Sequence, residues 1–384
     1  MAAFLRTFVL LGLRVFVVDG RASSMSRTPG LAPGWPNGPS PGWPSATIAS
    51  ESIKCNVMLP GEPDGFYQGT RFEKPVITSL VHEGHQYHGL WFNRTNTSVR
   101  DWEFQGDSVV AGLASAAAGP VDKFSPVGYD EAKPGNGTFV VIGNGVLRRS
   151  AQDTGGYDAF HTYEVVDAGK WSVTRVSPSA IRVTHHVQDA ASGFGYIYNK
   201  TIELRGSSMV LTRSLRNTGE HTIKSSEVLN HNFLTFDHQV TAAGTSVTVP
   251  FKIAPDDLLN TTLGELRNST SLVLKQTLDH HQMVVTAIAP AAKLADGNDQ
   301  ISAADNLIVV ESPATGLGVR IQGDYALEKI FLFAIRSLIA PEPIFALELP
   351  QGAIKTWSST YTYYKLTGAT KVAKTTFAAN AKSM

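Results

Sequence analysis

Apolar and polar residues alternate with a period of two along most of this 384-residue chain. Such alternation places successive side chains on opposite faces, which is typical of half-buried β-strands. Helical patterns are scarce, and the best two are short ones at 108–118 and 255–259. The clearest alternating runs are rich in Val, Ile, Thr and Tyr and are separated by turn-forming residues; they cover 138–142, 171–176, 181–185, 209–215, 318–321 and 360–364. The pattern predicts an all-β protein.

Many strands without intervening helices favour a sandwich or barrel over a parallel α/β sheet. We expect one large antiparallel β-sandwich over residues 49–366, with no repeat of the propeller or solenoid kind. Residues 23–48 are dominated by Ser, Pro and Gly and bury too little apolar area to fold, so they are interpreted as a linker. Residues 367–384 are rich in Lys, Ala and Thr and are expected to form a loose tail.

The first 22 residues have the pattern of a signal peptide. Arg6 precedes the apolar stretch 7–18, and small residues follow at 20–22. The alternative interpretation is that this segment is a disordered tail or an anchoring tail. The chain also carries six Asn-x-Ser/Thr sequons, at Asn93, Asn96, Asn136, Asn199, Asn260 and Asn268. We therefore expect a secreted, extracellular glycoprotein, with no membrane association once the leader is removed, because no later apolar run is long enough to span a bilayer.

Charge and cysteine content narrow the possible partners. Lys plus Arg equals Asp plus Glu at 33 each, so nothing in the overall charge favours nucleic acid as a partner. The single cysteine, Cys55, cannot form an internal disulfide, so stability must come from a packed core. We interpret Cys55 as a small buried apolar residue rather than a nucleophile.

One histidine stands in a distinctive setting. A strand, an Asn217-Thr218-Gly219 turn and a second strand lead to His231, which is flanked by two Asn and followed by aromatic residues. An imidazole has a pKa near neutrality and can both give and accept a proton. The alternative is a strand-end histidine whose nitrogens bond to the backbone.

A second candidate is Glu348, inside the apolar segment 343–352. A carboxylate among apolar residues is costly unless it is paired or hydrogen-bonded, so its presence calls for a reason.

Together these segments resemble the aldose 1-epimerase (galactose mutarotase-like) superfamily. The resemblance implies that His231 is the general acid and Glu348 the general base, converging on one open cleft. They would open a sugar ring and interconvert its anomers without a cofactor. The segment 142–149 resembles the superfamily's His-Gly-x-x-Arg segment, with Asn144 in the place of the histidine and Arg148 as the arginine. Gly69-Thr70-Arg71-Phe72 resembles an early strand that supplies a substrate-binding Arg71.

Further pocket residues complete the expected site. His161 is able to supply the donor that Asn144 lacks, and Asp237 is expected to contact the substrate. In a glycosidase, Asp237 or Asp158 would be the second carboxylate beside Glu348. The expected ligand is a mono- or oligosaccharide, and the oligomeric state is left open. No metal is expected at His82-Glu83-Gly84-His85, because its spacing is too short for a zinc-protease helix. The alternatives are a non-catalytic carbohydrate-binding protein, which Asn144 favours, and a polysaccharide lyase or hydrolase using the same cleft.

Overall fold

The computed structural model describes residues 43–61, 65–254, 263–291 and 301–367. The leader, most of the linker (residues 23–42), almost all of the tail and the short helix expected at 255–259 lie outside these ranges. The described residues form 25 β-strands and one short 3-10 turn, η1 (Phe236–His238), with no α-helix among them. The prediction of an all-β protein is therefore confirmed.

The largest sheet has ten strands, all paired antiparallel. In spatial order they are β12 (Lys170–Ser177), β13 (Ala180–Asp189), β14 (Phe194–Arg205), β15 (Ser208–Asn217), β25 (Ile354–Lys365), β22 (Leu317–Gly323), β21 (Leu307–Ser312), β17 (Ser246–Thr248), β19 (Ser271–Leu274) and β18 (Gly264–Arg267). The period of two holds in this sheet: side chains along β14 and β15 alternate between buried and partly exposed.

A five-stranded antiparallel sheet and a four-stranded antiparallel sheet complete the main framework. The five-stranded sheet is ordered β20 (Met283–Ile288), β23 (Lys329–Ile335), β24 (Leu338–Leu349), β16 (Ile223–His231) and β8 (Val121–Phe124). The four-stranded sheet is β1 (Ser45–Ala49), β2 (Ile53–Met58), β3 (Val76–His82) and β4 (His85–His88).

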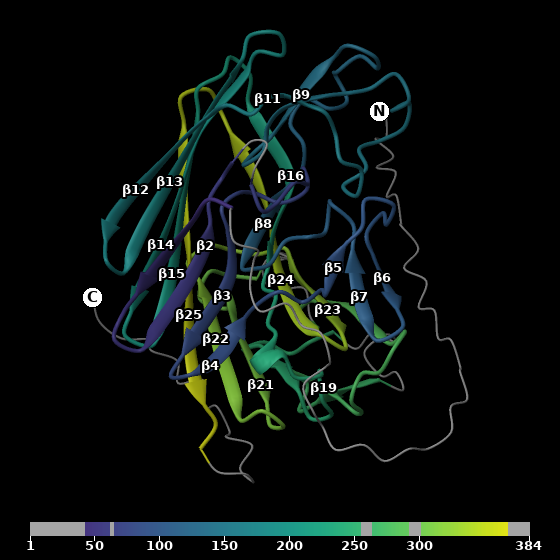
Figure 1. The fold of residues 1–384 in the computed structure, drawn as a ribbon, viewed down its shortest axis with the longest axis vertical. Helices are drawn as coiled ribbons and strands as arrows, with labels where there is room; N and C mark the ends of the chain where they lie inside the picture. The colour runs from purple at the N-terminus through teal and green to yellow at the C-terminus, as the bar shows by residue number, and fades with distance from the viewer. Residues whose placement is uncertain (1–42, 62–64, 255–262, 292–300, 368–384) are drawn as a thin grey trace, which may run out of the picture.

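Two small sheets lie outside this framework. One is ordered β11 (Val165–Asp167), β10 (Gly145–Arg148) and β9 (Thr138–Val141); the other is ordered β5 (Arg94–Thr95), β7 (Ser108–Ala111) and β6 (Trp102–Gln105). Figure 1 shows β12–β15 along one side of the molecule and β5–β7 along the other, with β23 and β24 between them.

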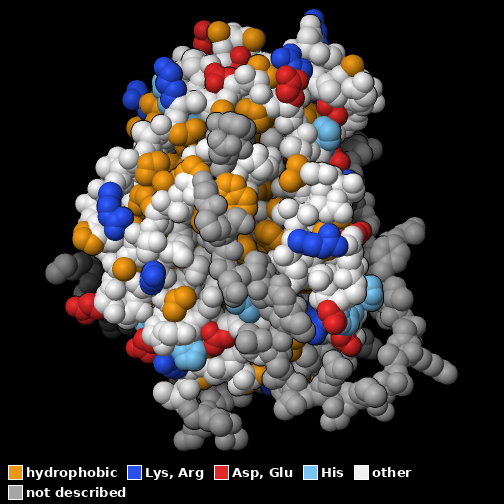
Figure 2. Space-filling view, in the orientation of Figure 1, with side chains coloured by type: hydrophobic (Ala, Val, Ile, Leu, Met, Phe, Trp, Pro, Cys, Tyr) orange, Lys and Arg blue, Asp and Glu red, His pale blue; other side chains and the backbone are white. Residues whose placement is uncertain are grey.

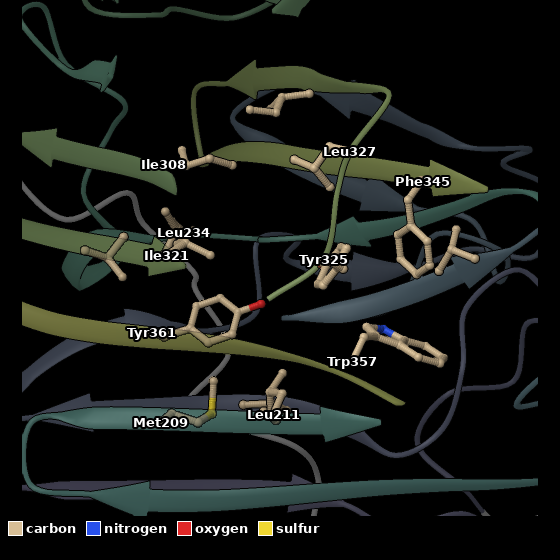
Figure 3. Close-up of a cluster of buried hydrophobic side chains, with 14 of the residues drawn as sticks. Met209, Leu211, Leu234, Ile308, Ile321, Tyr325, Leu327, Phe345, Trp357 and Tyr361 are labelled. Carbon is tan, nitrogen blue, oxygen red and sulfur yellow. The ribbon is translucent and has the colours of Figure 1, made fainter. Parts of the chain in front are cut away.

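The main core lies where the ten-stranded sheet faces the five- and four-stranded sheets. Leu211 and Tyr361 of the first pack in one buried cluster with Phe345 of the second and Ile53 of the third. Figure 3 shows part of this cluster, including Met209, Leu211, Phe345, Trp357 and Tyr361. Cys55 belongs to the same cluster, which confirms that it is buried in the apolar core. Burial raises the pKa of its thiol to about 12, which disfavours the thiolate form that a nucleophile needs.

A second core covers the opposite face of the five-stranded sheet. Val121 and Ala340 of that sheet pack with Phe72, which lies between β2 and β3, and with Trp91 and Ala117, which lie just before β5 and after β7. The face that carries this second core also carries the candidate site described below.

The structure differs from two sequence expectations. The helix expected at 108–118 is wrong: its first four residues form β7, which pairs with β5 and β6. A Cβ at Gly112 would meet the carbonyl oxygen of Val99 at 2.0 Å, so the chain turns there in close backbone contact, and the Ala-rich residues that follow are buried in the second core. In addition, β1 begins at Ser45, so pairing with β2 takes in the last residues of the expected linker.

Charged side chains of both signs share the visible surface (Figure 2). Lys and Arg side chains are scattered among Asp and Glu on the face shown in Figure 2. None of the helical segments in the described part of the chain has the length and apolar character needed to cross a bilayer.

Candidate active site

The site is built on the end of β16, at His231. This strand pairs with β8 on one side and β24 on the other, with His231 opposite Val121 and Leu229 opposite Ile344. Continuing the antiparallel register by two residues puts Glu342 of β24 directly across from His231. The His231 Nε2 atom lies 3.5 Å from a carboxylate oxygen of Glu342, and the two side chains are only 2% and 6% exposed.

The surroundings shift the pKa values of these two groups in opposite directions. Burial raises the pKa of Glu342 from 4.5 to about 8, although the nearby cations Arg71 and Lys123 act to lower it. Burial, with the same two cations, lowers the pKa of His231 well below 6.5. At neutral pH the pair therefore consists of a protonated carboxyl group and a neutral imidazole.

Hydrogen bonding orients the imidazole for this arrangement. The Nδ1 atom of His231 lies 3.3 Å from the carbonyl oxygen of Leu229. A proton on Nδ1 donates to that carbonyl and leaves the lone pair of Nε2 directed at Glu342. The Phe72 ring packs nearly perpendicular to the imidazole, at an interplanar angle of 81° and with ring centroids 4.7 Å apart. His231 is thus placed to accept a proton, whereas the sequence resemblance assigned it the role of general acid.

Arg71 reaches this pair from a segment that runs beside β8. An antiparallel bridge joins Phe72 to Lys123, which sets the segment against the free edge of β8. The Nη1 atom of Arg71 donates to the Ser115 hydroxyl at 3.0 Å and lies 3.5 Å from a carboxylate oxygen of Asp101. The Arg71 guanidinium also lies 4.7 Å from the centre of the Phe72 ring, so it covers the side chain that packs on His231.

A stack of alternating rings and cations continues from Arg71 to the surface. The Phe160 ring centre lies 4.5 Å from the Arg71 guanidinium and 4.8 Å from that of Arg100. Arg100 is 65% exposed and contacts both carboxylate oxygens of Asp158 at 2.8 Å. Phe72, Arg71 and Phe160 therefore form a continuous series of contacts from the buried pair to the exposed Arg100.

Glu348 does not pair with His231, which corrects the sequence prediction. It is 66% exposed and forms a salt bridge of 3.0 Å with Lys224, its cross-strand partner on β16. Glu348 lies six residues beyond Glu342 on β24, so at ~3.3 Å per residue the two carboxylates are roughly 20 Å apart. The expected open cleft is also absent among the described residues around His231, because both members of the actual pair are buried.

The other sequence-predicted residues are placed elsewhere. Arg148 pairs with Glu164 at 2.9 Å and lies on β10 of a small three-stranded sheet, whereas His231 lies on the five-stranded sheet. His161 is exposed, with its ring against Tyr163 at 4.6 Å. Asp237, in a left-handed conformation in η1, accepts from the backbone N–H of Gln86 and contacts His85 Nδ1 at 2.8 Å.

Asn144 is buried in the turn between β9 and β10, and neither its amide nitrogen nor its amide oxygen has a hydrogen-bond partner in the described part of the chain. A buried amide of this kind is costly unless a ligand or an ordered water meets it. The prediction that Asn144 contacts a substrate stays a prediction.

The histidines considered for metal binding face separate partners. The Nδ1 atom of His82 contacts the Ser52 carbonyl oxygen at 3.3 Å, and His85 pairs with Asp237. His88 lies between the Phe233 carbonyl oxygen at 2.9 Å and the Tyr363 hydroxyl at 3.1 Å. Within the described ranges, no group of three or more His, Cys, Asp or Glu side chains is arranged to hold a metal ion.

A small pocket near η1 is a separate feature. It is lined by hydroxyl groups, including those of Thr235 and Thr245, which are buried without hydrogen-bond partners among the described residues. The volume open to the centre of a water molecule in this pocket is about 10 Å³, so the pocket holds about one water and is far too small for a sugar. It is therefore not a rival to the His231–Glu342 site.

The fold and the site together define a large β-sandwich with a buried acid–base pair on one sheet face. No protein-family profile matches the chain, and no curated protein matches it in sequence. Among solved structures, the chain is similar to a GalM/aldose epimerase homologue from C. elegans, with 11% identity, a TM-score of 0.46, and 85% of this chain and 100% of that chain covered.

Two further solved structures are similar at the same level. A galactose mutarotase-like protein from Lactobacillus casei has 13% identity and a TM-score of 0.44, covering 83% of this chain and 100% of that chain. A Synechocystis protein has 10% identity and a TM-score of 0.47, covering 90% and 100%. At these TM-scores and identities the likenesses assign neither an activity nor a substrate, so the chemistry below rests on the residues of this chain.

Proposed function

We propose that this protein is a carbohydrate-active isomerase that opens and recloses the ring of a sugar hemiacetal by acid–base catalysis. The observation that carries the proposal is the His231–Glu342 pair, whose two pKa values are shifted in opposite directions by burial. Titratable neighbours whose environments shift their pKa values in this way are typical of acid–base sites. The Asn-His-Asn-Phe segment that carries His231 adds support through its resemblance to the aldose 1-epimerases.

The reaction balances with these two groups alone. Protonated Glu342 donates its proton to the ring oxygen of the sugar, and His231 Nε2 accepts the proton of the anomeric hydroxyl. The C1–O5 bond breaks, giving the open-chain aldehyde, an ionised Glu342 and a charged imidazole. Rotation about C1–C2 and reclosure return both protons and give the other anomer.

The neighbouring cations suit the charged intermediate state. Arg71 and Lys123 both act to lower the pKa of Glu342, so they stabilise its carboxylate once the proton has left. Lys123 is held 3.7 Å from Glu227 and stays close to β16. The negative charge that forms on Glu342 during the reaction is therefore stabilised by Arg71 and Lys123, which are already in position.

A sugar must displace part of the cover to reach the pair. The acid and base are now 3.5 Å apart, and a ring placed between them requires them to separate. Phe72 and Phe160, the rings that border Arg71, offer apolar faces for the C–H faces of a sugar. The burial of the pair also favours a second candidate function, a non-catalytic carbohydrate-binding protein in which His231 and Glu342 are structural.

Anomer exchange measured by NMR on a panel of free sugars distinguishes the two functions. We expect the wild-type protein to accelerate exchange of at least one sugar, and Glu342→Gln and His231→Asn each to reduce the rate by about 10²- to 10⁴-fold, the usual contribution of a general acid or base. Glu348→Gln, on the same strand but exposed, is the matched control and should keep full activity. Sugar binding without any acceleration would reject the isomerase in favour of the binding protein. Full activity in Glu342→Gln would instead reject Glu342 as the proton donor.

A further inference from the structure

A buried polar network lies directly behind the candidate site. Asn230 precedes His231 on β16 and Asn232 follows it directly after the strand ends, so alternation turns both side chains to the opposite face of the sheet, toward the main core. There the hydroxyl of Tyr361, from β25 of the ten-stranded sheet, lies 2.7 Å from the side-chain oxygen of Asn230 and 2.8 Å from that of Asn232. Figure 3 shows Tyr361 projecting from its strand into the core.

Each of the two asparagines also donates a hydrogen bond to another strand of the five-stranded sheet. The amide of Asn230 donates to Asp122 of β8 at 2.5 Å, next to Lys123. The amide of Asn232 donates to the carbonyl oxygen of Pro341 at 2.8 Å, one residue before Glu342 on β24. The Tyr361 hydroxyl therefore connects, through one residue each, the strands that carry Lys123, His231 and Glu342.

The network is anchored by a buried ion pair. Arg213 of β15 contacts Asp122 through two nitrogens, at 2.9 and 3.0 Å, and both residues are almost completely buried. A buried ion pair with its hydrogen-bonded neighbours is seldom more stabilising than an apolar core of the same volume. Its cost calls for a role besides stability, and the geometry offers one: the network fixes three strands of the five-stranded sheet to the sheet behind them.

We infer that Tyr361, acting through Asn230 and Asn232, is a positioning residue that sets His231 against Glu342. The inference rests on the proposed acid–base function of that pair. Tyr361 touches neither the pair nor a substrate placed at it, because its hydroxyl lies on the other face of β16.

Tyr361→Phe tests the inference, because it removes one oxygen and leaves the aromatic ring in the core. Tyr363→Phe is the matched control: Tyr363 is on the same strand and the same face, is equally buried, and its hydroxyl contacts His88 rather than the asparagines. Both variants should lose a few degrees of melting temperature through loss of a buried hydrogen bond.

The readout that separates positioning from stability is the titration of the Glu342 carboxyl group, followed by carbon NMR without any sugar. In Tyr361→Phe we expect the midpoint to move down from about 8 by half a unit or more, because a loosened pair admits water. We also expect kcat to fall at least tenfold with KM little changed. In Tyr363→Phe the midpoint and kcat should stay at the wild-type values.

A Tyr361→Phe titration that coincides with that of Tyr363→Phe would overturn the inference, whatever the stability loss. The proposed function fails separately, since it is rejected by an absence of anomer exchange in the wild-type protein. The carboxyl titration needs no substrate and is readable in either case.

Discussion

Replacing Glu342 by Gln should change how the stability of the protein depends on pH. Gln keeps the shape of the side chain but cannot ionise. In the wild-type protein, burial raises the pKa of Glu342 from 4.5 to about 8. At about 1.4 kcal/mol per pKa unit, ionising this carboxyl in the folded state costs roughly 5 kcal/mol more than in the unfolded chain.

The sign and window of the effect follow from which state holds the proton. Between pH 4.5 and 8 the folded protein keeps a proton on Glu342 that the unfolded chain has lost, so the free energy of unfolding falls as pH rises. His231 has a lowered pKa and acts below pH 6.5, where the unfolded chain takes up a proton and stability falls as pH falls. From pH 6.5 to 8 the contribution of Glu342 exceeds that of His231, whose protonation in the unfolded chain is at most half complete there.

Urea unfolding at pH 6.5, 7.25 and 8 measures the effect. Relative to Glu342→Gln, the wild-type protein should lose about 2 kcal/mol across this window, at constant m-value. Taking the difference between the two proteins cancels the other titrating groups. Glu348→Gln, which removes an exposed carboxylate from the same strand, should run parallel to the wild type. If the Glu342→Gln and wild-type curves are also parallel, Glu342 is already ionised at pH 6.5 and the protonated-acid assignment is refuted.

Three other predictions follow from the same structure. Burial lowers the pKa of His88 to about 4, so the wild-type protein should lose about 3 kcal/mol as pH falls from 6.5 toward 4 and the unfolded chain takes up the proton; acid unfolding of His88→Gln should lack much of this loss. Arg71→Ala should raise the carboxyl titration midpoint of Glu342 in NMR, since the Arg71 cation lowers it, and an unchanged midpoint would show that Arg71 is too well screened to matter. Asn136 and Asn268 are exposed sequon residues, so protein exported by a glycosylating host should carry N-glycans there. Endoglycosidase should then lower the apparent mass of the wild-type protein, and by less in Asn136→Gln and Asn268→Gln. An unchanged mass in the wild type would count against glycosylation.

The alternating pattern was enough to predict the fold class, because a strand with one buried face records its own geometry in its sequence. The same pattern could not separate Glu342 from Glu348. They are six residues apart on β24, an even spacing, so alternation puts both on one face of the sheet. What differs is the position along the strand: Glu342 lies under the second core, whereas Glu348 lies at the exposed end beside Lys224.

The residues around Glu342 do not by themselves identify it as a site residue; the structure does. Its flanking residues, Pro341 and Pro343, were available in the sequence, yet what identifies the carboxylate is the register that sets it opposite His231. Register depends on contacts between residues more than 100 positions apart, which a period of two does not encode. For the same reason no sequence pattern indicates that Tyr361 contacts the two asparagines beside His231.

The helix expected at 108–118 was wrong for a related reason. An Ala-rich segment favours helix when it stands alone, but here it is buried as a turn over the second core. Tertiary packing outweighed the local preference, which is worth only a few tenths of a kcal/mol per residue.

The pH dependence of kcat/KM for anomer exchange tests the central claim most directly. If Glu342 is the acid and neutral His231 the base, activity requires a protonated carboxyl and an unprotonated imidazole. The rate should then be level near neutrality and fall as pH rises through about 8, where Glu342 loses its proton, and its acid limb should lie well below pH 6.5. A rate that instead rises through pH 8, or an alkaline limb unchanged in Glu342→Gln, would contradict the assignment of Glu342 as the proton donor.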